Sequence, residues 1–176
     1  DMVFNRSSLT GFLSFLVSYF VLVALWSVHY NFFRRTNYMD NVIIVLNAIL
    51  LFVTLYYVFP LKTMVQSWMG EGVRSREDLA SLFIMYGLGF LLIFLCFSLM
   101  YYRTFKKSKS TNKGLLQFFY ARHFAVFVLV ALISILMAYF DVGLKFGLPG
   151  FAYVLIGPFC TLHTVRFYKT YTIEDT

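Results

Sequence analysis

Five long apolar stretches limit the possible fold of this chain more than any other feature. An α-helix needs about 20 consecutive apolar residues to cross a hydrocarbon core of about 30 Å. Stretches of that kind lie at about 9–33, 39–59, 79–102, 118–140 and 147–168. We therefore predict an all-α fold, a polytopic membrane helix bundle with five spans in this chain.

The composition supports lipid as the solvent of most of the chain. Of the 176 residues, 60% are hydrophobic and 13% are charged, whereas a soluble domain carries about 25% charged residues. A chain with so few charges cannot surround its apolar residues with a polar shell, so the composition excludes a soluble enzyme, a disordered chain and a disulfide-rich secreted domain. Cys96 and Cys160 lie in apolar runs and predict two reduced thiols.

Prolines are expected to mark helix ends. Pro60 follows the second apolar stretch and is predicted to end that span, because proline lacks the N–H group that a helix interior requires. Pro149 lies at the start of the fifth stretch, where proline costs least. Acidic residues after Ser75 are typical of a helix start and predict that the third helix begins there.

The positions of the basic residues predict the topology. The net charge is +7, and the positive-inside rule places the more basic loops in the cytoplasm. The C-terminus is then cytoplasmic and residue 6 lies on the other side. The chain shows no signal peptide, so we expect an earlier helix to carry that end across the membrane. The basic residues on the cytoplasmic side are Arg34, Arg35, Arg103, Lys106, Lys107, Lys109, Lys113, Arg122, Arg166 and Lys169.

The acidic residues exclude several kinds of transporter and enzyme. All 8 of them lie at a terminus, in a loop or at the end of a span, whereas proton pumps and sodium-coupled carriers often need a carboxylate inside the membrane. Asp40 and Asp141 are interpreted as helix-end residues. The sequence contains none of the common hydrolase or nucleotide-binding motifs, and we predict that the protein is not an enzyme.

Three histidines leave a redox alternative open. His29, His123 and His163 are each expected near the cytoplasmic end of a different span. A haem held by two histidines in a helix bundle is built in this way, so a membrane haem protein is an alternative. Ordinary histidines that form hydrogen bonds at the membrane interface are the simpler interpretation.

Polar side chains in the first two spans are the most informative candidates for a site. Trp26 and His29 lie near the end of the first span, and Asn47 lies within the second. The short turn at 34–40 makes these spans an antiparallel hairpin, so His29 and Asn47 can meet at a similar depth. A polar group in lipid must find a partner. The bond would be either a structural contact or the support of a pore-lining element.

These residues resemble part of a known channel family. The first two spans resemble the second and third helices of prokaryotic members of the transmembrane protein 175 family, which are potassium-permeable channels. The shared pattern is a Trp, a His three residues later, an aromatic-rich helix end and an Asn in the next helix. The resemblance covers nearly the whole chain and is best over 10–105. The segments that carry it include Leu25-Trp26-Ser27-Val28-His29-Tyr30-Asn31-Phe32-Phe33, Leu46-Asn47-Ala48, Phe59-Pro60-Leu61-Lys62 and Met85-Tyr86-Gly87-Leu88-Gly89-Phe90.

The resemblance implies six helices per subunit and a homotetramer. In this family the first helix carries an Arg-x-x-x-Phe-Ser-Asp signature and lines the pore, with bulky apolar side chains at the constriction. Asp1 resembles the last residue of that signature, so we expect that about 25–30 residues, including the first pore helix, are missing between Phe4 and Asn5, and that more are missing before Asp1. The resemblance also implies that Trp26, His29 and Asn47 form a hydrogen-bond network that supports the signature.

The sequence thus predicts a subunit of a potassium-permeable cation channel that conducts passively through a pore on the oligomer axis. Its expected partners are potassium ions, the lipid bilayer and identical subunits, with no cofactor and no nucleic acid. The expected location is the prokaryotic plasma membrane. The alternatives are the haem protein described above and a membrane scaffold that does not conduct ions.

Overall fold

A computed structural model of the chain describes residues 6–70, 75–108 and 112–171. These residues are almost entirely helical, and no strand occurs within those three ranges, which confirms the all-α prediction. The helices are α1 Arg6–Thr36, α2 Asn41–Trp68, α3 Arg76–Lys107, α4 Asn112–Tyr139, α5 Leu148–Phe151 and α6 Ile156–Thr170, with 3-10 turns η1 Leu144–Phe146 and η2 Ala152–Leu155.

Five segments among the described residues are long and apolar enough to cross a membrane. They contain between 23 and 32 residues, and at about 1.5 Å per residue each one reaches across a hydrocarbon core of about 30 Å. The fifth combines α5, η2 and α6 over Leu148–Thr170. Ser75 caps α3 by accepting a hydrogen bond from the Asp78 amide at 3.0 Å, as predicted for the start of that helix.

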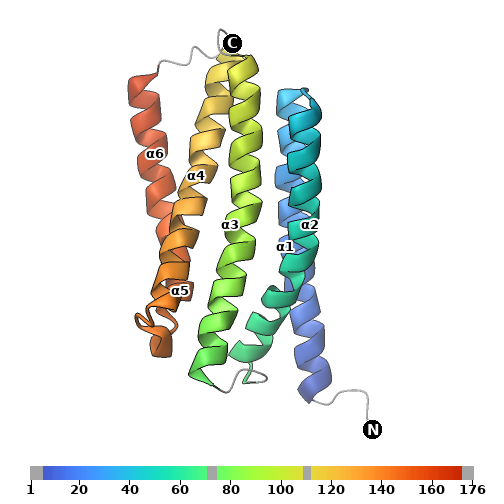
Figure 1. Ribbon diagram of the computed structural model, residues 1–176, viewed down its shortest axis with the longest axis vertical. Coiled ribbons are helices and arrows are strands. Elements are labelled where there is room, and N and C mark those ends of the chain that lie inside the picture. The colour runs from blue at the N-terminus through green and yellow to red at the C-terminus, as the bar shows by residue number, and fades with distance from the viewer. Residues whose placement is uncertain (1–5, 71–74, 109–111, 172–176) are drawn as a thin grey trace.

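The helices form a row in which neighbours in sequence pack on each other (Figure 1). The central helix α3 packs on α2 and α4, while α1 packs mainly on α2 and α6 packs on α4. The ends of α1, α3 and α6 and the beginnings of α2 and α4 share one end of the bundle, the upper end in Figure 1. We call this the basic end, because most of the described Lys and Arg residues lie there.

The prediction that Pro60 ends the second span is wrong. Helix α2 continues through Pro60 to Trp68, and its lower part bends toward the start of α3 (Figure 1). Proline removes one backbone hydrogen bond and kinks a helix, but does not end it when packing holds the next turns. Pro60 is fully buried, and buried side chains follow it. The Thr63 hydroxyl also donates to the Phe59 carbonyl at 3.1 Å.

The fifth segment begins with irregular turns, and Pro149 lies near its start as predicted. Gly143 and Gly147 have φ values of 62° and 68°, which favour glycine. A Cβ atom on Gly143 would also collide with the Leu148 side chain. The Ser134 hydroxyl of α4 donates to the Pro149 carbonyl at 2.7 Å. This carbonyl therefore has a hydrogen-bond partner although the helix is broken there.

Two ion pairs join helices at opposite ends of the bundle. At the basic end, Asp40 Oδ2 accepts from Arg103 Nη2 at 2.8 Å and from Nε at 2.9 Å, while its Oδ1 caps α2 through the Ile43 amide at 2.9 Å. At the other end, Arg76 pairs with Asp141 through Nη2–Oδ2 at 2.6 Å and Nε–Oδ1 at 2.9 Å. Both aspartates are helix-end residues, as predicted.

Two glycines let α3 approach both of its neighbours closely. A Cβ atom on Gly87 would lie 2.6 Å from Ile135 Cγ1 of α4, and one on Gly89 would lie 2.5 Å from Tyr57 Cδ2 of α2. Atoms cannot pack at these separations, so each position requires glycine at this helix spacing. The segment Met85-Tyr86-Gly87-Leu88-Gly89-Phe90 therefore serves packing on two sides of one helix.

Replacing Gly89 with alanine should destabilise the bundle by about 1–3 kcal/mol, because the buried Tyr57 ring must move. The measurement is reversible unfolding of the purified protein in mixed micelles. Gly11→Ala is the matched control, since a Cβ atom there meets nothing within 4 Å. Equal stability of the two variants would contradict the close approach of α3 and α2.

Acidification should remove the contribution of Asp40. The Ile43 amide and the Arg103 guanidinium hold the pKa of Asp40 below its usual value of 3.8. A carboxyl with a lowered folded-state pKa stabilises the fold above its unfolded pKa, and this stability is lost as the pH falls through the folded pKa. The melting temperature of Asp40→Asn should therefore lie below that of the unchanged protein at neutral pH and converge with it below pH 3.8. A gap that widens on acidification would contradict this.

Candidate functional site

His29 of α1 and Asn47 of α2 form a hydrogen bond within the membrane-spanning region. His29 Nε2 lies 2.6 Å from Asn47 Oδ1, so the prediction that these side chains meet is confirmed. A carboxamide oxygen can only accept, and His29 Nε2 is therefore the protonated ring nitrogen. The Phe33 ring packs edge-on against the His29 ring, with centroids 5.0 Å apart.

This bond matters because α1 lies at the edge of the row and packs mainly on α2. In the first half of α1, Thr10, Ser14 and Ser18 are buried, and their small size lets helices approach closely. The Ser14 and Ser18 hydroxyls bond to carbonyls of α1 itself at 2.7 and 2.8 Å. They satisfy their own polar groups without joining two helices, whereas His29–Asn47 joins α1 to α2.

Trp26 lies one turn before His29 and exposes its ring. The residue is 63% exposed, and its ring stacks on Tyr30 with ring centroids 5.6 Å apart. Beside it, a groove of about 210 Å³ runs between α1 and α2, lined by mainly apolar side chains and floored by Phe97 of α3. Trp26 and His29 both line this groove.

One surface is formed by the exposed Trp26 indole, the apolar groove and His29, whose ring is hydrogen-bonded to Asn47. This surface fits the apolar side chains of another helix. Whether Trp26, His29 and Asn47 support a pore helix stays a prediction. Asp1 and the junction of Phe4 and Asn5 lie outside the described residues.

The histidines do not converge on one site. His29 is bonded to Asn47, while His123 of α4 and His163 of α6 lie on the far side of α3, with ring centroids 5.8 Å apart. The Phe119 ring packs against both, with its centroid 5.4 Å from that of His123 and 5.2 Å from that of His163. Within the part of the chain that the structure describes, no three His, Cys, Asp or Glu residues gather. The haem alternative therefore has no support.

Sequence reasoning missed an aromatic cluster in the interior of the bundle. Tyr86 of α3 lies between Tyr57 of α2 and Tyr153 of η2, at centroid distances of 5.3 and 5.5 Å. Phe90 and Phe94 continue the cluster along α3. The aromatic residues beside Gly87 and Gly89 could have predicted this cluster, because glycines let helices approach closely and so bring the flanking rings together.

Comparisons with known proteins agree with one another. A family model described as the endosomal/lysosomal potassium channel TMEM175 matches residues 3–60. A potassium channel of Marivirga tractuosa is 31% identical in an alignment that covers 86% of this chain and 70% of the relative. A crystal structure of a single-substitution variant of the potassium channel MtTMEM175, in complex with a nanobody–MBP fusion protein, matches with a TM-score of 0.78 and 29% identity over 93% of this chain and 80% of that one.

A double-mutant cycle measures the bond between α1 and α2. His29→Ala, Asn47→Ala and the double variant should show a coupling free energy of about 0.6–1.7 kcal/mol in unfolding from mixed micelles, the range for such bonds in membrane proteins. A second cycle with His29→Ala and Thr54→Ala is the control, because the Thr54 hydroxyl lines the same groove but bonds to the Leu50 carbonyl. Coupling in the control alone would contradict the assigned contact.

Proposed function

The chain belongs to the TMEM175 family of potassium channels, and we propose that it forms one subunit of an oligomer in which potassium ions pass through a pore on the symmetry axis. The observation that carries this proposal is the interior of the bundle. The aromatic cluster around Tyr86 and Phe94 fills the space between α2, α3 and α4. An ion path therefore fits between subunits better than within one.

Conduction is passive in this proposal. The described acidic residues are Asp40, Glu77, Asp78 and Asp141, and each lies at the end of a helix. No described carboxylate stands in the middle of a span, where a coupled carrier would bind a proton or a sodium ion. Dehydration of the ion at an apolar constriction would then set the barrier.

The surface around His29 supports the pore. The His29–Asn47 bond fixes α1 on α2, and the groove beside it presents Trp26 and apolar side chains. A pore-forming helix that packs on this surface would be held at a fixed distance from the axis. Trp26, His29 and Asn47 act as positioning residues in this arrangement and do not touch the ion.

The proposed assembly is a homotetramer in the prokaryotic plasma membrane, with the basic end and the C-terminus in the cytoplasm. The charge distribution supports this orientation, because the positive-inside rule favours cytoplasmic Lys and Arg. At that end Arg35 lies over the Tyr120 ring at 4.5 Å and Lys106 over the Tyr102 ring at 4.9 Å. Such cation–π contacts fit the membrane interface.

Potassium flux from liposomes tests the proposal. The reconstituted protein should release potassium down its gradient without a proton or sodium gradient. His29→Ala and Asn47→Ala should each lower the flux by up to about fivefold, because loss of about 1 kcal/mol changes the ratio of the supported to the unsupported state by that factor. Thr161→Ala is the control and should conduct normally, because the exposed Thr161 hydroxyl bonds to the Gly157 carbonyl of its own helix and lies outside this groove.

Two outcomes would overturn the proposal. A correctly assembled protein without flux would favour the scaffold, and a Soret band in the purified protein would favour the haem alternative. Normal flux through assembled His29→Ala and Asn47→Ala variants would contradict the support role alone.

A further inference from the structure

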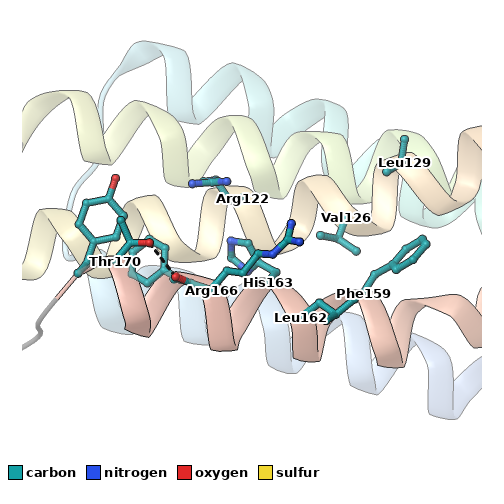
Figure 2. Close-up of a pocket in the computed structure, with 10 residues that line it drawn as sticks. Arg122, Val126, Leu129, Phe159, Leu162, His163, Arg166 and Thr170 are labelled. Carbon is teal, nitrogen blue, oxygen red and sulfur yellow. Dashed lines mark hydrogen bonds between the residues drawn. The ribbon is translucent and has the colours of Figure 1, made fainter.

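A second groove, separate from the one beside His29, lies between α4 and α6 toward the basic end. Its volume is about 530 Å³. Figure 2 shows Arg122 from α4 beside His163 and Arg166 from α6, with apolar side chains further along the same groove. The helices are antiparallel, so the apolar part formed by Leu129 and Phe159 lies deeper in the membrane than the two arginines.

The two arginines have no carboxylate partner among the described residues. Asp40 at the same end is bound by Arg103, and the other described acids lie at the starting end of α3 or at the end of α4. The Arg122 guanidinium lies over the Phe118 ring at 5.5 Å, which leaves its positive charge uncompensated. Two guanidinium groups without a carboxylate partner attract an anion.

The chemistry of the groove changes along its length in the way that a phospholipid does. Toward the basic end it carries two guanidinium groups, which bind phosphate through paired hydrogen bonds. Deeper in the membrane it is apolar, with Leu129, Phe159 and Leu162 in its wall. A soluble anion would use only the first part, whereas a phospholipid would use both.

We propose that this groove binds one anionic phospholipid of the cytoplasmic leaflet, with its phosphate between Arg122 and Arg166 and an acyl chain along Leu129, Phe159 and Leu162. His163 forms the floor beneath the phosphate, where its ring stacks on Phe119 with centroids 5.2 Å apart. The leaflet rests on the proposed orientation, but lipid binding itself does not depend on ion conduction, and its test measures lipid binding and thermal stability.

Native mass spectrometry of the detergent-purified protein tests this proposal. With added phosphatidylglycerol, the protein should retain one tightly bound lipid per chain and melt at a higher temperature. Phosphatidylcholine with the same acyl chains should bind at least about tenfold more weakly, because charge attraction sets the preference. Inorganic phosphate should not raise the melting temperature, because it cannot fill the apolar part.

Variants locate the lipid. Arg122→Gln with Arg166→Gln should weaken phosphatidylglycerol binding about tenfold, while Lys106→Gln with Lys107→Gln, which removes the same charge at the same end but outside the groove, should not. Arg122→Lys with Arg166→Lys keeps the charge and should retain the preference for the anionic lipid, which provides a second test if the glutamine variant fails to fold.

Other occupants give different results. Equal binding of the two phospholipids, or equal weakening by the Lys106 and Lys107 changes, would overturn the proposal. If the melting temperature rises with protein concentration and does not change when lipid is added, the groove binds a second copy of the chain instead. If Glu174→Gln with Asp175→Gln lowers the melting temperature and phosphatidylglycerol has no effect, the acidic C-terminal residues occupy the groove instead.

Discussion

The absence of water from the bilayer core accounts for most of this structure. A backbone or side-chain polar group in that region must find its partner inside the protein. Helices satisfy the backbone, and Ser14 and Ser18 satisfy their hydroxyls on their own helix. Where a helix is broken near Pro149, the Ser134 hydroxyl bonds to the Pro149 carbonyl. His29 has no such local solution and bonds to Asn47 of the next helix, so the same requirement that forms the helices also joins α1 to α2.

The strength of packing differs along the row of helices, and this difference relates to function. The central helix α3 is fixed on both sides through Gly87 and Gly89 and through the ion pairs of Arg76 and Arg103. In contrast, α1 lies at the edge and has few contacts beyond α2. A firmly packed centre and an edge helix that the His29–Asn47 bond joins to α2 suit the proposed subunit, in which α3 supports the fold and the α1–α2 surface carries a pore element. The groove between α4 and α6 lies on the other side of α3.

Local chemistry explains which features the sequence could predict. The five spans follow from runs of apolar residues, and the His29–Asn47 bond follows from two polar side chains in a short hairpin, so both could be read without coordinates. The helix through Pro60 could not, because burial of the following turns decides whether a proline ends a helix or only bends it. Likewise, the contact of His123 with His163 depends on how α6 packs on α4, and two residues 40 positions apart carry no local signal of that contact.

Current through a planar bilayer under a tenfold potassium chloride gradient is the most direct measurement of what this protein does. A passive potassium-permeable pore predicts a current that reverses close to the potassium equilibrium potential, about 59 mV from zero for a tenfold gradient of a monovalent ion. That reversal should not move when a proton or sodium gradient is added. Absence of current from the assembled protein, or a current that requires a second ion gradient, would contradict a passive channel.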